Sequence, residues 1–379
     1  MKLFDQLERE RGFSGDETLI LDQVRRICAE VIAPNAARYD AQAAYPEASM
    51  AAVNELGLNG LFLPEAYGGS PVRFAVYLEA VKMISEACAS TGIIYATNCH
   101  GMKPLVDFGT EAQKQRLLPA IAQGGLGSLA ITESDAGSDA TGMKTRFRDD
   151  GDDIIIDGRK IFISNGDRAE RILLFGKWSG IDDPKAAISA LIVERDTPGF
   201  SVGRVEDKMG HRAAPTVELL FDGARVPRAN LLGEPGDGLR ILLASLNKSR
   251  PSVAAHALGI ATAAFRDMVG YMNERVQSRQ RVIDFQGNQF MLADLATDLA
   301  MAERWLDYVG ELVEQGAADF GLEASIAKMR ASDLAMHGGY GYCRDHRVER
   351  LMRDAKITQI WEGTNQIHRQ LIGRSFRTR

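Results

Sequence analysis

The strongest constraint in this sequence is its hydrophobic periodicity, which changes twice along the chain. From residue 16 to about 122, apolar residues recur every three or four positions, which predicts amphipathic helices. From about residue 124 they form short β-branched runs separated by Gly, Asp, Asn and Pro, which predicts antiparallel β structure. After Gly238 the helical period returns and holds as far as HGGYGY. This order of blocks predicts an α+β multidomain fold and excludes the alternating pattern of a doubly wound nucleotide-binding fold.

The domains expected from these changes are an N-terminal helical domain at 1–123, a middle β domain at 124–233 and a C-terminal helical domain at 234–379. A chain of 379 residues is long enough for each of them to bury its own core.

Charge and composition narrow the expected partners to small molecules. The formal net charge is −6 and no segment concentrates the basic residues, so we expect no nucleic-acid surface. No stretch approaches the roughly 18 apolar residues that a membrane span needs. The cysteines, Cys28, Cys88, Cys99 and Cys343, have no C-x-x-C spacing, and the histidines are dispersed. We therefore expect a cytoplasmic protein with no disulfide framework and no metal site.

The first segment that could carry chemistry is LAITESDAGSD, residues 129–139, where a predicted strand enters a loop of small residues. Gly137 and Ser138 would let backbone N–H groups approach a phosphate or carbonyl oxygen, and Thr132 offers a hydroxyl to a ring atom. The alternative is a tight turn capped by Asp135 and Asp139.

The second segment is RKIFISNG, residues 159–166, a strand that ends in Asn165-Gly166, a strong hairpin signal. Phe162 and Ser164 are two apart in this strand and should share a face, where they could contact a flat heterocycle. The alternative is that Phe162 belongs to the core.

The third segment is RDAKITQIWEGTNQI, residues 353–367, in which Glu362 follows an apolar run. A carboxylate beside Trp361 would be partly desolvated and therefore more basic, as a general base for a weakly acidic proton must be. The alternative is a surface or N-cap glutamate at the start of a helix.

These segments occur in the same order and spacing as in the acyl-CoA dehydrogenase family of flavoproteins, which the chain resembles over nearly its whole length. FGTEAQKQRLLPAIAQG, KSRPSVAAHALGIATAAF, DFQGNQFMLADLAT and HGGYGY support the same resemblance. It implies a helical N-terminal domain, a β-barrel-like middle domain and a C-terminal four-helix-bundle domain, with the active site between them.

The resemblance also implies an activity: an acyl-CoA thioester loses its α-proton, and its β-hydrogen passes as hydride to FAD, leaving a trans-2-enoyl-CoA. Glu362 matches the catalytic base, and electrons would pass on to an electron-transfer flavoprotein. The family is usually a homotetramer, a dimer of dimers, in which Arg275 and Gln277 reach the FAD of a neighbouring subunit. Trp361 beside the base hints at a short or unusually shaped acyl pocket.

The residues that match the family's substrate contacts are Ser138, Asn247, Arg250 and Gly363. Those that match its FAD contacts are Leu129, Ile131, Thr132, Gly137, Ser138, Phe162, Ile163, Ser164, Arg275, Gln277, Gln286, Ala335, Gly339, Thr364 and Gln366.

The chain departs from the family at two places that affect the FAD site. The usual R-x-Q-F-G is Arg275-Val-Gln-Ser278-Arg279, and the helical segment before HGGYGY is about two turns short, which places Ala335 where a glutamine is usual. Weak FAD binding is one expected consequence. Two alternative functions therefore remain open: a partner subunit that supports assembly of a hetero-oligomer, and an oxygen-using flavoenzyme of the same fold.

Overall fold

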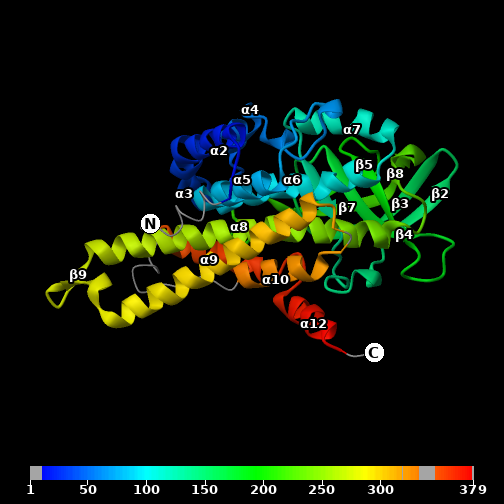
Figure 1. Cartoon of the computed structure of the whole chain (residues 1–379). Helices are drawn as coiled ribbons and strands as arrows, with labels where there is room; N and C mark the ends of the chain where they lie inside the picture. The colour runs from blue at the N-terminus through cyan, green and yellow to red at the C-terminus, as the bar shows by residue number, and fades with distance from the viewer. Residues whose placement is uncertain (1–10, 318, 333–345, 378–379) are drawn as a thin grey trace.

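The structure is a computed structural model that describes residues 11–317, 319–332 and 346–377. The N-terminal part is a layer of helices above the rest of the molecule (Figure 1). Its helices are α2 (Gly15–Ile27), a π-helical turn (Cys28–Ile32), α3 (Ala33–Gln42), α4 (Glu47–Glu55), α5 (Phe74–Ala87), α6 (Ala89–Phe108) and α7 (Glu111–Ala122). Capping boxes at Ser14 and Thr110 start α2 and α7. α6 is buried along most of its length and is the central helix of this layer.

The middle part is one eight-stranded sheet in the order β6-β7-β3-β2-β4-β5-β8, with β1 beside β4. The strands are β1 (Gly127–Ala130), β2 (Arg146–Asp150), β3 (Asp153–Ser164), β4 (Arg171–Trp178), β5 (Ile188–Glu194), β6 (Phe200–Val205), β7 (Thr216–Pro227) and β8 (Leu231–Leu232). Most pairs are antiparallel, as the sequence predicts, but β4 pairs in parallel with both β1 and β2. The sequence pattern contained no sign of these parallel pairs, because they join strands that are not consecutive.

The C-terminal part consists of α8 (Gly238–Glu274), α9 (Gln286–Glu314), α10 (Gly321–Ser332), α11 (Val348–Thr358) and α12 (Asn365–Ser375). α8 and α9 form a long antiparallel pair that extends beyond the other elements to a hairpin of β9 (Val276–Gln277) and β10 (Gln280–Arg281). In Figure 1 the sheet lies at the opposite end of α8 from this hairpin. Short 3-10 helices occupy Leu58–Gly60, Glu65–Tyr67, Ala140–Gly142, Arg228–Asn230 and Val282–Asp284. The expected order of helical, β and helical blocks is confirmed.

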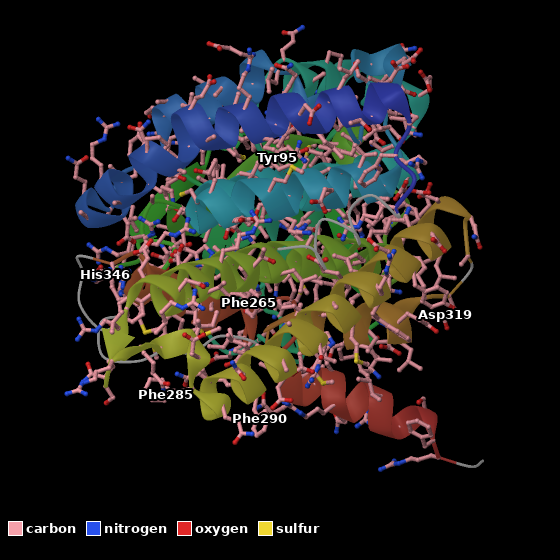
Figure 2. All side chains as sticks on the ribbon, turned by 60° about the vertical axis from the view of Figure 1, so that its left-hand side comes forward. Tyr95, Phe265, Phe285, Phe290, Asp319 and His346 are labelled. Atoms are coloured by element: carbon pink, nitrogen blue, oxygen red, sulfur yellow. The ribbon has the colours of Figure 1, made fainter. Side chains whose placement is uncertain are left out.

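One hydrophobic core joins the N-terminal helices to α8 and α9. Tyr77 and Tyr95 are fully buried in it, with ring centroids 5.6 Å apart. Figure 2 shows Tyr95 and Phe265 between the helices, whereas Phe290 lies at the outer edge of α9, where it is 62% exposed. The helical layers therefore form one packed unit that leaves part of α9 uncovered in the single chain.

The hairpin expected at Asn165-Gly166 is wrong. The chain turns there, but β3 pairs with β2 and β7, and the next strand, β4, pairs with β1, β2 and β5. The Asn165 amide donates instead to the carbonyls of Ile94 and Gly127, at 3.0 and 3.3 Å. These bonds to α6 and β1 outweigh the local preference of the Asn-Gly pair, because they satisfy a buried amide.

No helix in the described part of the chain is long and apolar enough to span a membrane. Cys28, Cys88 and Cys99 are free and buried, and Cys343 lies outside the described residues. The cytoplasmic location stays a prediction.

Candidate active site

Glu362 lies in the loop between α11 and α12, and its side chain is 16% exposed. Its φ of 52° is in the left-handed region that non-glycine residues seldom adopt. Ser249 on α8 donates a hydrogen bond to Glu362 Oε2 at 2.6 Å, and His100 Nδ1 on α6 lies 4.0 Å from Oε1. The carboxylate is thus held between two helices that the sequence separates widely. It does not cap a helix, because Thr364 is the N-cap of α12.

A buried lysine fixes the backbone of the loop that carries Glu362. Lys328 on α10 is fully buried and donates to the Gly363 carbonyl at 2.7 Å and to Asn365 Oδ1 at 3.1 Å. The Asn365 N–H closes the loop on the Gln359 carbonyl at 3.0 Å. The φ of Gly363 is +91°, a conformation that glycine adopts readily and other residues seldom do. The ring of His368 packs against it.

Arg250 follows Ser249 on α8 and is buried. It donates from Nη1 to Asn247 Oδ1 at 3.0 Å, and its Nε has no hydrogen-bond partner among the described residues. Burial lowers the pKa of Arg250, and the nearby Glu362 carboxylate opposes this shift. Two of the four residues expected at the substrate site, Asn247 and Arg250, thus lie together on α8, with Asn247 orienting the guanidinium.

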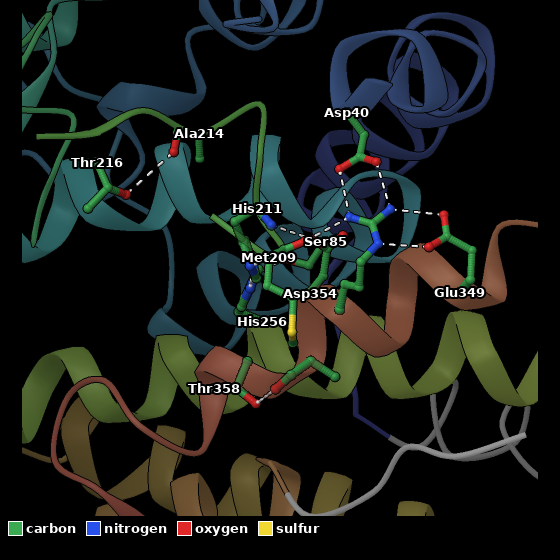
Figure 3. A network of polar contacts seen from close by, with 12 residues as sticks. Asp40, Ser85, Met209, His211, Ala214, Thr216, His256, Glu349, Asp354 and Thr358 are labelled. Carbon is green, nitrogen blue, oxygen red and sulfur yellow. Dashed lines mark hydrogen bonds and ion pairs between the residues drawn. The ribbon is translucent and has the colours of Figure 1, made fainter. Parts of the chain in front are cut away.

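Trp361, directly before Glu362, packs against two buried histidines. Its ring centroid is 5.1 Å from that of His211, which precedes β7, and 5.7 Å from that of His256 on α8. Nε2 of His256 lies 2.9 Å from Nε2 of His211, and Nδ1 of His256 lies 2.8 Å from Ser85 Oγ (Figure 3). This cluster joins α5, α8 and the sheet behind the loop.

Asp354 on α11 completes the cluster from the other side. It is buried, and it accepts a hydrogen bond from the backbone N–H of His211. Burial raises the pKa of Asp354 to about 7. Its neighbour Arg353 binds both Asp40 on α3 and Glu349, as Figure 3 shows, so α11 is also tied to the N-terminal helices.

A buried ion pair supports the loop of residues 131–145, where contacts with the flavin and its phosphates are expected. Lys160 on β3 is fully buried and donates to Glu133 Oε1 at 2.7 Å and to the Ile131 carbonyl at 2.9 Å. Glu133 also accepts from the Thr145 hydroxyl and the Lys144 N–H, each at 2.6 Å. Burial would raise the pKa of Glu133, but Lys160 and these donors outweigh it and lower the pKa. Burial lowers the pKa of Lys160 to about 8.

The face of β3 expected to meet the flavin has an exposed aromatic ring. Phe162 is 59% exposed with a φ of 59°, at a β-bulge where the register with β7 shifts. Ser164 is partly exposed, whereas Ile163 is 2% exposed and packs into the sheet core. Of these residues, Ile163 could therefore contact a cofactor only through its backbone.

The loop side of the same site is open. Leu129, Ile131 and Thr132 are partly exposed, Gly137 and Ser138 are exposed, and no atom lies within 4 Å of the space that a Cβ on Gly137 would occupy. An exposed aromatic ring and an open loop of small residues and hydroxyl groups fit a bound flavin and its phosphates, and we conclude that these residues suit FAD.

Three of the other expected FAD contacts lie at the tip of the α8 and α9 pair, far from the sheet. Arg275, Gln277 and Gln286 are exposed at the far end of the α8 and α9 pair (Figure 1), and so they cannot reach the site of their own subunit. Ser278 and Arg279 form the two-residue turn of the β9-β10 hairpin, with φ of 50° and 67°, conformations that a glycine would adopt more readily. Thr364 uses its hydroxyl to cap α12, and Gln366 is exposed. Ala335 and Gly339 lie outside the described residues.

A cavity of about 30 Å³ lies between α6 and α8, close to the carboxylate but not lined by it. Its lining includes His100 and Ser249, the two residues next to Glu362. A larger cavity, of about 260 Å³, lies between α2, α5 and α8 and shares no lining residue with it. Several charged groups of the larger cavity pair with one another, as Lys82 does with Glu303 and Arg11 with Glu79.

The fold combines a largely buried carboxylate, Glu362, with exposed residues of the β domain that suit a flavin, and comparison with known families gives the class of the protein. The Acyl-CoA dehydrogenase N-terminal, middle and C-terminal domains match residues 14–125, 128–224 and 236–376. The chain belongs to the acyl-CoA dehydrogenase family. This confirms the expected class of enzyme, an oxidoreductase of acyl-CoA thioesters with FAD as cofactor.

Similar proteins extend over almost the whole chain. An acyl-CoA dehydrogenase of Bacillus subtilis is 40% identical over 370 residues, covering 95% of this chain and 97% of its own. The structure of butyryl-CoA dehydrogenase from Megasphaera elsdenii is 35% identical, with a TM-score of 0.92, over 96% of this chain and 98% of its own. A chain from a structure described as the electron transferring flavoprotein of Acidaminococcus fermentans is 37% identical, with a TM-score of 0.93, over 97% of this chain and 99% of its own.

Several site residues were missed in the sequence. Lys160, Lys328 and Asp354 are charged residues inside otherwise periodic segments, and only a buried position distinguishes them from surface charges. His211 and His256 are far apart in sequence and have no metal-ligand spacing, so nothing in the sequence indicates that they meet. Position in the helical period could have flagged His256 and Lys328 as inward-facing, since both have apolar neighbours three or four residues away.

Proposed function

We propose that this protein oxidises an acyl-CoA thioester to the trans-2-enoyl-CoA, with Glu362 as the base that removes the α-proton. The observation that carries the proposal is the position of the Glu362 carboxylate, held by Ser249 beside a cavity between α6 and α8. The bound FAD would accept the β-hydrogen as hydride, so that proton and hydride together account for the new double bond.

The chain's own residues would act by positioning and by excluding water. Ser249 donates to one oxygen of Glu362, which leaves the other oxygen to take the proton. Lys328 and Gly363 hold the loop backbone, and the histidine cluster behind Trp361 limits its movement. Leu129, Thr132, Phe162 and Ser164 would border the flavin, and Gly137 and Ser138 its phosphates. Asn247 and Arg250 on α8, and Gly363 in the loop that carries the base, would contact the acyl-CoA.

We further propose that electrons leave to an electron-transfer flavoprotein, in keeping with the structural relative described under that name. A homotetramer is the proposed assembly. The exposed positions of Arg275, Gln277 and Gln286 support it, because these residues could serve an FAD site only in a neighbouring subunit. The uncovered apolar side chains of α9, such as Phe290 and Met301, support it as well.

Anaerobic titration of the purified protein with acyl-CoA tests the proposal. The wild-type flavin band should bleach, while Glu362→Gln should keep FAD and bind acyl-CoA without bleaching. Glu311→Gln, on the exposed face of α9, is the matched control and should behave as wild type. Flavin reduction that survives in Glu362→Gln would remove this residue as the base.

The purified protein also distinguishes the proposed dehydrogenase from the two alternatives, a partner subunit and an oxygen-using flavoenzyme. The Ser278-Arg279 turn favours a partner subunit with a weakened site, and a colourless chain that gains FAD only with a second family member would support that function. Rapid reoxidation of the reduced flavin by oxygen would support the oxygen-using alternative.

A further inference from the structure

The cavity beside Glu362 extends along two antiparallel helices. At one end His100 on α6 faces Ser252 on α8, and at the other Asp107 on α6 binds Lys248 on α8 at 2.7 Å. His100 and Asp107 are about two helical turns apart, roughly 10 Å along α6. A substrate whose α-carbon reaches Glu362 could therefore direct the end of its acyl group toward Asp107 and Lys248.

Most of the surface of this cavity is apolar, but charged and hydroxyl-bearing side chains are among its lining residues. The lining comprises Phe74, Cys99, His100, Lys103, Pro104, Asp107, Phe108, Ser245, Lys248, Ser249 and Val313. Ser245 is 5% exposed, and its hydroxyl has no hydrogen-bond partner in the described part of the chain. A buried hydroxyl without a partner is unfavourable unless a ligand or water satisfies it.

Positive charge exceeds negative charge at the far end of the cavity. Lys103 and Lys248 both bind the one carboxylate of Asp107, so one positive charge is left over. Their side chains are 28% and 32% exposed, so both ammonium groups reach water at the cavity mouth. Arg240 lies over the ring of Phe108, 5.0 Å from its centroid, but its charge is paired with Asp237 at 3.4 Å and adds nothing to this surplus. His100 stays neutral near pH 7, because burial lowers its pKa.

We propose that the acyl group of the substrate is short and ends in a carboxylate, which Lys248 and Lys103 bind together with the Ser245 hydroxyl. This inference rests on the proposed function and adds the substrate class to it. A carboxylate would balance the surplus charge and accept the hydrogen bond that Ser245 has to give. A plain alkyl chain would do neither, and would take the ammonium groups partly out of water. The small volume of about 30 Å³ limits the length of the group.

The test uses the holoenzyme under anaerobic conditions and two pairs of thioesters matched in carbon number: glutaryl-CoA with valeryl-CoA, and adipoyl-CoA with hexanoyl-CoA. The rate of flavin bleaching at low substrate concentration should be about tenfold higher or more for the carboxylate-bearing member of a pair. That factor is of the size expected from one hydrogen-bonded ion pair.

Variants then show whether the named residues cause the preference. Lys248→Met should reduce the ratio between the two members of a pair about tenfold, and Ser245→Ala should reduce it to a smaller extent. Lys114→Met, on the surface of α7, is the matched control and should leave the ratio unchanged. Lys103→Met provides an independent check if Lys248→Met does not fold.

Each remaining outcome overturns the inference. Faster bleaching by valeryl-CoA and hexanoyl-CoA would overturn the substrate class while leaving the dehydrogenase function intact. A carboxylate preference that survives in all three pocket variants would show that other residues recognise the group. Bleaching by none of the thioesters would remove the proposed function, and the inference with it.

Discussion

His211 donates a hydrogen bond from Nε2 to Nε2 of His256, across 2.9 Å, and the surrounding bonds fix the tautomers of both rings. The Ser85 hydroxyl donates to the Val81 carbonyl at 2.6 Å, so it must accept from His256 Nδ1. His256 therefore presents Nε2 as an acceptor, and His211 carries its proton on Nε2. Burial lowers the pKa of His211 well below its usual value and that of His256 to about 3, so both rings are neutral.

We expect His256→Leu to destabilise the protein and to slow flavin reduction. The substitution leaves the His211 N–H buried without a partner, at about 1–3 kcal/mol, and removes one of the rings that support Trp361. Thermal unfolding and stopped-flow bleaching of the flavin measure the two effects. His346→Leu, at an exposed position, is the control. Wild-type rates in His256→Leu would show that the cluster does not position the loop.

Asp354 should make the stability of the protein depend on pH. Its pKa is about 7 in the folded chain and about 4 in the unfolded chain, so between these values the native state holds a proton that the unfolded state has lost. This contribution is complete below about pH 4 and is lost as the pH rises toward 7, at up to ~1.4 kcal/mol per pH unit. His211 Nδ1, which has no partner among the described residues, lies 3.9 Å from Asp354 Oδ1, close to where the carboxyl proton could be shared.

The measurement compares wild type with Asp354→Asn, which cannot ionise. From pH 4 to 7 the melting temperature of the wild type should fall relative to that of the variant. Parallel curves would show that Asp354 is ionised throughout this range.

Loss of the Ser249 hydroxyl should slow the proton-removal step. Ser249→Ala removes the 2.6 Å hydrogen bond that orients the Glu362 carboxylate, and we expect about tenfold slower flavin reduction. Ser249→Thr keeps a hydroxyl and should retain most of the rate. If both variants react equally, the hydroxyl has no part in positioning the base.

The ion pair between Lys160 and Glu133 should control FAD retention. Lys160→Met leaves the Glu133 carboxylate buried without its cation, which costs about 3–5 kcal/mol and releases the loop that begins at Ile131. The purified variant should contain less FAD than wild type, as measured by the ratio of the absorbance of the flavin band to that of the protein. Lys144→Met, in the same loop but in an exposed pair with Asp135, should retain its FAD.

Gly210 allows the loop before β7 to lie against α11. A Cβ at this position would lie 2.3 Å from the Arg353 carbonyl oxygen, so Gly210→Ala must push the loop and α11 apart. We expect a lower melting temperature and slower flavin reduction, because His211 and Asp354 lie next to this contact. Gly270→Ala on α8 meets no atom within 4 Å and should be neutral or slightly stabilising. Equal behaviour of the two variants would show that the loop can relax away from α11 without consequence.

The part of the site that could be predicted lies where chemistry and local pattern coincide. The segment RDAKITQIWEGTNQI, in which Glu362 follows Trp361, predicts a candidate base. The small residues around Gly137 predict a loop that can approach a phosphate. The partners of Glu362 could not be predicted, because Ser249 and His100 come from helices more than 100 residues away, and nothing local distinguishes them. The Asn165-Gly166 hairpin shows the opposite error, since there a strong local signal yielded to distant bonds.

The sequence by itself determined the order of helical and β blocks and the family, and it supplied Glu362 as the candidate base. These properties follow from periodicity and from residues that are close together in the chain. Tertiary structure alone decided that β4 runs parallel to β1 and β2, that Lys160 and Lys328 are buried cations, and that His211, His256 and Asp354 meet behind Trp361. The reason is physical: burial and hydrogen bonding depend on which surfaces pack together, and packing joins residues whose separation along the chain carries no periodic signal.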